Sequence, residues 1–402
     1  MLASLESFED NRELAMGAFS LLSKLTESGN SGQKDAVQML RTPEAKEKIM
    51  NAINMYAGDV AMRTVSANII NQIAGPTDIA QAKADMKAAV ADIASDESGD
   101  AAARARKALQ SLSAFAIAPQ TGMMVMEENG LQSFVDCLKT VAMQQEVPGQ
   151  QAIISLSTAS INALLQNTVT KDAVVAQCDN GKLIKAISTS IKMNPSIDPT
   201  NSMRLMRTMA AERTLAPVLI SNGGVEAVVA CVRGNQENPE AVAHGVEVLQ
   251  RIAAQGPEGI QKVVRKGGVR MVTKLLDNSD TAFDKTRVPM LELLKQLASS
   301  PDARNIMIKQ GVKDSVVRVM AANPTHVEIQ NLGGHIIRDC TTENDLYACA
   351  EALVQQATQK NAVNVGALLG NLGTMSSMAQ AGDSAKKLVE SAPAKILEGV
   401  AK

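Results

Sequence analysis

The sequence predicts an all-α protein, an α-solenoid of about nine three-helix repeats, and three observations carry that prediction. First, Ala, Leu, Val, Ile and 21 Met supply the apolar residues, while aromatic residues are only 2% of the 402-residue chain. Compact sheets rely more heavily on aromatic and β-branched residues, so this composition favours helices. Second, pairs of helices separated by glycine recur at nearly equal intervals. Third, another amphipathic helix follows each pair.

The glycine nearest the second helix of each pair sets the repeat length. It falls at Gly130, Gly181, Gly224, Gly268 and Gly311, with successive intervals of 51, 43, 44 and 43 residues. The longest interval coincides with an insertion-like stretch, KTVAMQQEVPGQQ, after Leu138. A helix that reverses within two residues needs a left-handed backbone position, which glycine adopts without a Cβ clash. We therefore expect these glycines, Gly268 among them, to be left-handed.

The N-terminal part of the chain reads as repeats without this glycine. Residues 12–27 resemble a third helix whose earlier helices are missing, and residues 62–75 and 103–116 are further third helices. Residues 42–55 and 85–95 are predicted second helices. In the first of these, Thr42 is the expected N-cap and Pro43 the first helical residue.

The middle of the chain shows the three-helix pattern most clearly. Val225, Val228, Val229 and Val232 form one apolar stripe at helical spacing after Gly224. Third helices follow at 239–255 and 326–342, where Asn238-Pro239 and Asn323-Pro324-Thr325 mark their starts. The pattern degrades afterwards.

We predict one solenoid domain over residues 1–402, with a partial N-terminal repeat in 1–28 and C-terminal capping helices in 375–402.

The phrases NGG-VEAVVACV and KGG-VRMVTKLL, with the third-helix endings VLQRIA, LLKQLA and LLGNLG, resemble armadillo repeats. The short helix before the glycine favours armadillo over two-helix HEAT repeats. The resemblance implies a right-handed superhelical α-solenoid of armadillo-like three-helix repeats. It also implies protein–protein binding along a concave groove lined by third helices.

The chain departs from the nuclear-import branch of that family, whose third helices carry Trp and, four residues later, Asn. The chain has no Trp. The Asn-equivalent positions hold Lys24, Gln72, Ser111, Thr208, Arg251, Gln296, Asp339 and Asn371, of which only Asn371 keeps the family residue. The Trp-equivalent positions include Asn68, Lys107, Arg204, Glu247, Glu292, His335 and Ala367. A receptor for nuclear-localisation signals is therefore disfavoured.

Charge and motifs exclude several other functions. A net charge of −2 gives no general attraction for nucleic acid or for anionic membranes. No stretch is long and apolar enough to span a membrane. Histidines and cysteines lack metal-ligand spacing, and no phosphate-binding or nucleophile motif is complete. We expect no cofactor, no metal site and no enzymatic activity. Five scattered cysteines without a paired motif suggest a reducing, cytoplasmic location.

The sequence thus predicts a non-enzymatic interaction scaffold that binds a partner polypeptide. The candidate groove residues are Lys107, Ser111, Arg204, Thr208, Arg251, Glu292, Gln296, His335, Asp339 and Asn371. Lys107 and Arg204 place positive charge early, whereas Glu292 and Asp339 place negative charge later. The alternative is a structural subunit of a larger intracellular assembly, cytoskeletal or ciliary. Oligomeric state stays open.

Overall fold

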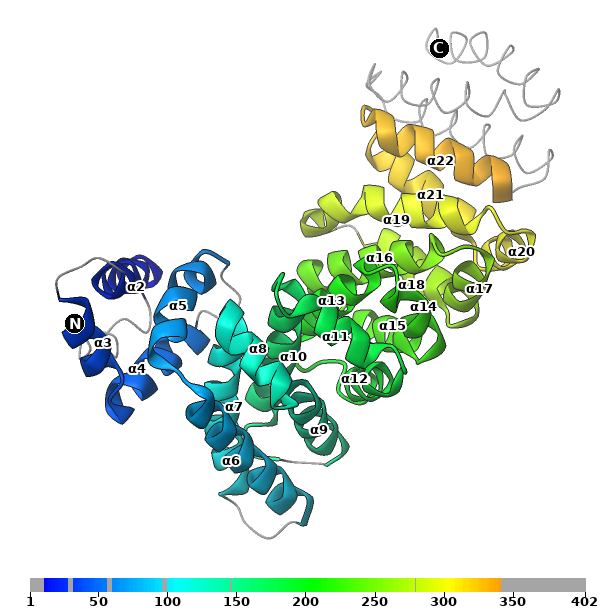
Figure 1. The fold of residues 1–402 in the computed structure, drawn as a ribbon. Coiled ribbons are helices and arrows are strands. Elements are labelled where there is room, and N and C mark those ends of the chain that lie inside the picture. The colour runs from blue at the N-terminus through cyan, green and yellow to red at the C-terminus, as the bar shows by residue number, and fades with distance from the viewer. Residues whose placement is uncertain are drawn as a thin grey trace, which may run out of the picture. The chain divides into compact units, whose positions relative to one another are not determined.

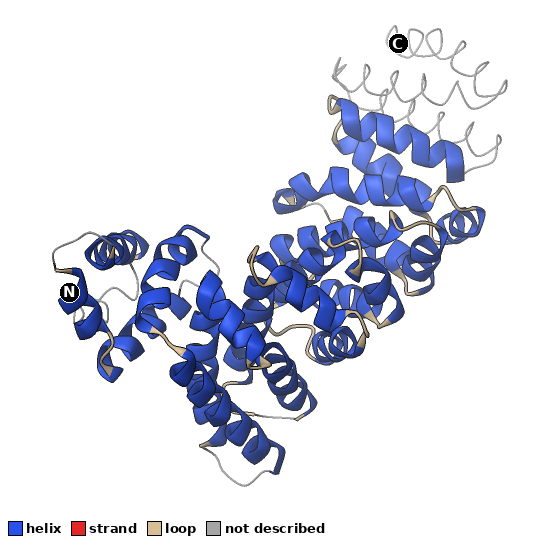
Figure 2. Cartoon of the chain, viewed as in Figure 1, coloured by secondary structure: helices blue, strands red, loops and turns tan. Residues whose placement is uncertain are grey.

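A computed structural model describes residues 11–27, 32–55, 60–95, 100–144, 147–278 and 280–340. Every regular element in those ranges is helical, as Figure 2 shows, which confirms the all-α prediction. The chain divides into two compact units, Met1–Ala227 and Val228–Lys402. The predicted capping helices in 375–402 and the candidate Asn371 lie outside the described residues.

The helices of the first unit follow one another in the order shown in Figure 1, and α2, α4, α5 and α7 match those that the N-terminal pattern predicts. They are α2 (Arg12–Thr26), α3 (Gln33–Leu40), α4 (Pro43–Met55), α5 (Val60–Ile73), α6 (Pro76–Ser95), α7 (Ala101–Ile117), α8 (Pro119–Glu127), α9 (Gly130–Met143), α10 (Gln150–Gln166), α11 (Lys171–Cys178), α12 (Lys182–Met193), α13 (Pro199–Ala211) and α14 (Leu215–Ser221). Helix α15 (Gly224–Gly234) contains the division between the units.

The second unit continues the same order of helices. They are α16 (Pro239–Ala253), α17 (Pro257–Arg265), α18 (Gly268–Leu276), the short 3₁₀ helix η2 (Thr281–Phe283), α19 (Asp284–Leu297), α20 (Pro301–Lys309), α21 (Val312–Ala322) and α22 (Val327–Cys340). The triplets α17–α18–α19 and α20–α21–α22 each reproduce the predicted unit of a short, a second and a third helix.

Like helices pack on like helices within each unit. In the first unit the third helices α7, α10 and α13 pack in succession, and the second helices α6, α9 and α12 do the same. In the second unit α16, α19 and α22 form the corresponding row, while α17 packs on α20 and α18 on α21. The helices of these rows therefore bury their apolar stripes partly against the equivalent helix of the neighbouring repeat, as expected for a repeat protein.

One repeat differs from the predicted arrangement. Residues 85–95 were expected to form a separate second helix, but α6 runs without interruption from Pro76 to Ser95. The stretch has no glycine or proline after its first residue, so nothing in it ends the helix. The repeat formed by α6 and α7 consequently has two helices instead of three.

The turn between first and second helices uses two neighbouring positions for two different purposes. In two repeats the left-handed residue lies one position earlier than expected. It is Gly223 (φ 86°) before Gly224 and Gly267 (φ 84°) before Gly268. In the repeat of Gly130 it is Asn129 (φ 56°). Gly181 and Gly311 are left-handed themselves, as predicted.

The prediction that Gly268 is left-handed is therefore wrong, and close approach of the backbone explains this glycine instead. It is the first residue of α18, where a Cβ would lie 2.9 Å from the carbonyl oxygen of Val263. A Cβ on Gly130 would likewise lie 2.7 Å from the carbonyl oxygen of Val125, and a Cβ on Gly224 would lie 2.8 Å from that of Leu219. These glycines let the second helix start directly against the end of the first.

Polar caps mark the starts of several third helices. The side chain of Asn238 accepts a hydrogen bond from the Ala241 N–H at 3.0 Å, with Pro239 at the first helical position, which confirms the predicted cap. Thr42 and Pro43 also take the predicted positions, since Pro43 is the first residue of α4 and the Thr42 carbonyl accepts from the Lys46 N–H at 3.0 Å. The Thr42 hydroxyl, however, donates to the Met39 carbonyl in the preceding turn. Before α22, Asn323 closes the turn and the ring of His326 accepts from the Ile329 N–H.

The core consists of aliphatic and Met side chains, with few aromatic rings. All four Phe residues of the described ranges, Phe19, Phe115, Phe134 and Phe283, are at most 1% exposed. Cys137, Cys178, Cys231 and Cys340 are buried free thiols. Burial raises the pKa of Cys137, Cys178 and Cys340 to about 12. These thiols stay protonated at neutral pH and fill space in the core.

We predict that Gly267→Ala destabilises the turn before α18 by about 1–2 kcal/mol, because Ala at φ 84° is strained. Gly17→Ala is the matched control, since Gly17 lies inside α2 with open space where a Cβ would stand. The control should stabilise α2 by about 0.5–1 kcal/mol. Hydrogen exchange of α17, α18 and α2 measures both effects. Unchanged exchange in α17 and α18 of Gly267→Ala would contradict the turn assignment.

We also predict that the native protein leaves Cys137 and Cys178 unmodified by iodoacetamide at neutral pH, since only the thiolate reacts and both thiols are buried. Peptide mass spectrometry should detect alkylation of both after unfolding in urea. Rapid alkylation in the folded protein would contradict their placement in the core.

Candidate partner-binding surface

The candidate residues within the described ranges lie on third helices and are exposed or half-buried. In the first unit Lys107 and Ser111 lie on α7, and Arg204 and Thr208 on α13. In the second unit Arg251 lies on α16, Glu292 and Gln296 on α19, and His335 and Asp339 on α22. The candidates thus form two groups, one in each unit.

A direct hydrogen bond joins two neighbouring third helices of the first unit. The Thr208 hydroxyl lies 2.7 Å from Oδ1 of Asn162 on α10 and donates to it. Asn162 lies beside Thr208 on the neighbouring third helix, yet it is absent from the predicted set. The insertion-like stretch obscured the helical register of α10, because that stretch contains the end of α9, a loop and the start of α10. The sequence signal for this change of register was the interval of 51 residues between Gly130 and Gly181, which is longer than the others.

The third helices α7, α10 and α13 contain no acidic residue, and α7 and α13 contain basic ones. Helix α7 carries Arg104, Arg106 and Lys107, and α13 carries Arg204 and Arg207. Helix α10 has no charged residue. The acidic side chain of Asp198 lies just before α13, where it caps that helix by accepting from the Asn201 N–H. We call the partly exposed residues of α7, α10 and α13 the basic third-helix face.

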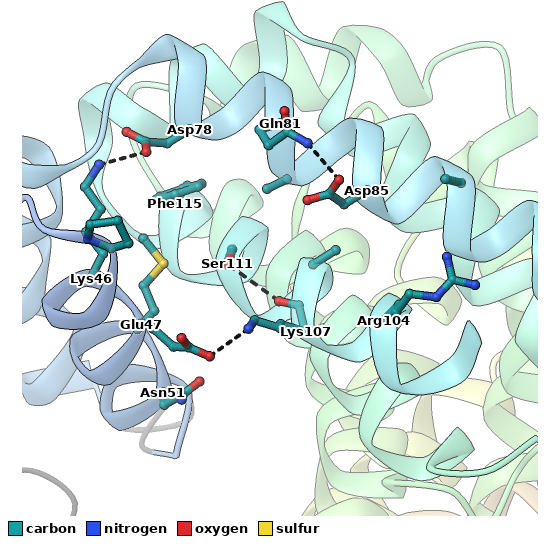
Figure 3. A pocket seen from close by; sticks show the side chains of 15 residues that line it. Lys46, Glu47, Asn51, Asp78, Gln81, Asp85, Arg104, Lys107, Ser111 and Phe115 are labelled. Atoms are coloured by element: carbon teal, nitrogen blue, oxygen red, sulfur yellow. Dashed lines mark hydrogen bonds and ion pairs between the residues drawn. The ribbon is translucent and has the colours of Figure 1, made fainter. Parts of the chain in front are cut away.

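Two cations of α7 contact acidic residues from the helices beside it. Lys107 Nζ lies 2.9 Å from Glu47 Oε1 on α4, and Arg104 lies 2.6 Å from Asp92 on α6. The Ser111 hydroxyl approaches the Lys107 carbonyl oxygen at 3.5 Å. Figure 3 shows the Glu47–Lys107 pair reaching across the opening between α4 and α7.

Glu47, Arg104, Lys107 and Ser111 line a cleft of about 510 Å³ between α4, α6 and α7. Its apolar lining includes Met50, Ala82, Ala108 and Phe115. Charged and polar residues surround that lining, among them Lys46, Glu47, Asn51, Asp78, Gln81, Asp85, Arg104, Lys107 and Ser111 (Figure 3). Lys107 and Ser111 therefore belong both to the predicted surface and to this cleft.

Side-chain contacts also join the third helices of the second unit. The Gln250 amide donates to the Pro289 carbonyl oxygen and to Glu292 Oε2, each at 3.0 Å. The Gln296 amide is oriented so that both its nitrogen and its oxygen have a hydrogen-bond partner. In this orientation its NH₂ group donates to the Gln250 carbonyl at 3.2 Å. Asp339 pairs with Arg338 at 3.0 Å. The acidic candidates Glu292 and Asp339 are thus already engaged within the unit.

No group of three or more His, Cys, Asp and Glu side chains in the described ranges could hold a metal ion. No single helix there is long and apolar enough to cross a membrane. Helices α14 and α15 meet the length and hydropathy criteria only as a pair, bent by 75°.

The described helices form an α-solenoid, and the solved structures that share its fold include armadillo-repeat solenoids. No family model matches the chain, and no curated protein matches it. Among solved structures, an engineered protein shares 17% identity and a TM-score of 0.54, covering 94% of this chain and 93% of its own. Designed armadillo repeat proteins for modular peptide recognition share 15% identity and a TM-score of 0.46, covering 63% and 98%.

A naturally occurring system is also among the similar structures. One matching chain comes from a structure concerning a phosphorylation switch that controls the interaction between cadherin and beta-catenin. It shares 11% identity and a TM-score of 0.51, and the match covers 94% of this chain and 69% of that one. At these identities the similarity shows the fold alone.

The fold lowers the pKa of His335 in the second unit. Partial burial lowers the pKa of its imidazole from 6.5, and the nearby Lys295 and Arg338 lower it further, while Asp339 acts in the opposite direction. The unfolded chain therefore binds a proton more readily than the folded chain does. For a histidine with a lowered pKa, stability is full above the unfolded pKa and falls as pH drops below it.

We predict that acidification from about pH 7.5 to about pH 5.5 lowers the melting temperature less in His335→Gln than in the natural chain. Gln keeps a polar side chain of similar size but cannot gain a proton in this range. Thermal unfolding followed by circular dichroism at both pH values measures the difference. Equal losses in the two proteins would show that His335 does not contribute.

Proposed function

We propose that the protein is a non-enzymatic scaffold that binds an extended, acidic segment of a partner protein along the basic third-helix face. The observation that carries this proposal is the absence of acidic residues from α7, α10 and α13, together with five Arg and Lys residues on α7 and α13. Complementary charge steers partners into place and excludes basic ones. The similar cadherin–beta-catenin structure comes from a system in which proteins bind one another, which supports the general role.

The side chains of this face suit binding to a peptide backbone as well. Asn162, Thr208 and Ser111 offer hydroxyl or amide groups between the cations. Such groups can donate to or accept from a backbone without selecting one partner side chain. Glu292 and Asp339 of the second unit are candidates for contact with basic residues of a partner, in exchange for their contacts with Gln250 and Arg338. We also propose a reducing, cytoplasmic location, which suits the four buried free thiols.

The test begins with selection of random 12-residue peptides displayed on phage against the immobilised full chain. Enriched peptides should be rich in Asp and Glu. Fluorescence polarisation then measures the affinity of one such peptide. We predict that Lys107→Glu combined with Arg204→Glu weakens binding about tenfold or more, since each reversal replaces attraction by repulsion. Folding should persist, because exposed charges contribute little to stability.

Lys139→Glu combined with Lys185→Glu is the charge-matched control. Both lysines are exposed in the same unit but lie on the second helices α9 and α12. This variant should bind within about twofold of the natural chain at about 0.15 M salt, where long-range effects are screened. Equal losses in the two double variants, or full affinity in Lys107→Glu/Arg204→Glu, would place binding elsewhere. Such a result would favour the alternative role as a subunit of a larger assembly.

A further inference from the structure

Asp198 stands at the start of α13 in a backbone conformation that few residues adopt. Its φ is 42°, in the left-handed region, where Asn and Asp are enriched among residues other than glycine. It is also the N-cap of α13, and its Oδ1 accepts a hydrogen bond from the Asn201 N–H at 3.3 Å. Asn fulfils both roles as well as Asp does, so neither role explains why a carboxylate is present.

The second carboxylate oxygen of Asp198 accepts two further hydrogen bonds. The hydroxyl of Ser155 on α10 donates to Oδ2, and the side-chain amide of Asn201 donates to the same atom at 2.8 Å. An Asn has only one side-chain oxygen, so it could accept at the N-cap or from these two donors, but not at both places. The carboxylate is therefore needed to make all three bonds.

These bonds also determine what Arg204 contacts one turn further along α13. Because the NH₂ group of Asn201 donates to Asp198, the Oδ1 atom of Asn201 is left to accept from Arg204 Nη1, at 3.1 Å. Arg204 is a half-buried residue of the basic third-helix face. A long side chain that is already held in one orientation loses less conformational entropy when it binds an anion. The orientation of the Asn201 amide thus links the Asp198 carboxylate to the Arg204 guanidinium.

We propose that Asp198 is a positioning residue, which acts through Asn201 to hold the Arg204 guanidinium ready for a carboxylate of the partner segment. This inference rests on the proposed function, because the carboxylate belongs to the acidic segment proposed there. Asp198 has the same sign of charge as that segment. Charge alone therefore predicts that neutralising Asp198 strengthens binding, whereas loss of positioning predicts that it weakens binding.

Asp198→Asn separates these two effects, because Asn suits both the left-handed conformation and the N-cap. Fluorescence polarisation with the acidic peptide selected on the full chain should show binding weakened about two- to tenfold, as expected for the ordering of one long side chain. In an Arg204→Ala background the same substitution should weaken binding less than about twofold, because the group that Asp198 positions is gone. Asp136→Asn is the matched control, since Asp136 is an exposed acidic residue of the second helix α9, and it should not weaken binding.

Circular dichroism establishes that each variant folds, and Asn201→Ala, which breaks the same link, repeats both measurements should Asp198→Asn unfold. Unchanged or tighter binding by the folded Asp198→Asn overturns the inference. An equal loss with and without Arg204 also overturns it, because Asp198 would then act only by holding α13 against α10. If Lys107→Glu/Arg204→Glu loses the peptide while Asp198→Asn keeps it, the proposed function stands without the positioning role. If Lys107→Glu/Arg204→Glu retains the peptide, the proposed function itself fails.

Discussion

The arrangement of the repeats depends on the turn between the first and second helices of each unit. One residue there must be left-handed, and in several repeats the next must lack a Cβ so that it can lie against a carbonyl oxygen of the first helix. Gly267 and Gly268 divide these two tasks. With the second helix held so close, the third helix completes the unit and packs on the third helix of its neighbour. The rows of third helices, and any surface they form, follow from this local constraint.

Much of this fold is predictable because its causes are local in the sequence. Prolines, caps and apolar stripes define α16 and α22 within a few residues, and the glycine intervals set the repeat length. Prediction fails where the structure depends on a choice between two adjacent residues or on a contact between residues far apart in the sequence. The sequence shows that Gly267 and Gly268 form a turn, but not which of them is left-handed. It also cannot show that Glu47 reaches Lys107, because that contact depends on α4 packing against α7.

The candidate surface shows the same division. Lys107, Arg204 and Thr208 lie on third helices as predicted, because their helical register follows from the stripe of apolar residues. Asn162 was missed because α10 begins after a longer connection, which shifts the apparent register. Its hydrogen bond to Thr208 shows that the row continues through α10. The absence of acidic residues from α7, α10 and α13 is readable in the sequence only after these helices have been grouped.

Photo-crosslinking tests the central claim, that the third helices form the binding surface, most directly. An enriched acidic peptide carrying a photoreactive residue near its centre would be irradiated with the full chain, and mass spectrometry would locate the crosslinked residues. The account predicts crosslinks on α7, α10 and α13. Crosslinks confined to the second helices α9 and α12 would contradict it.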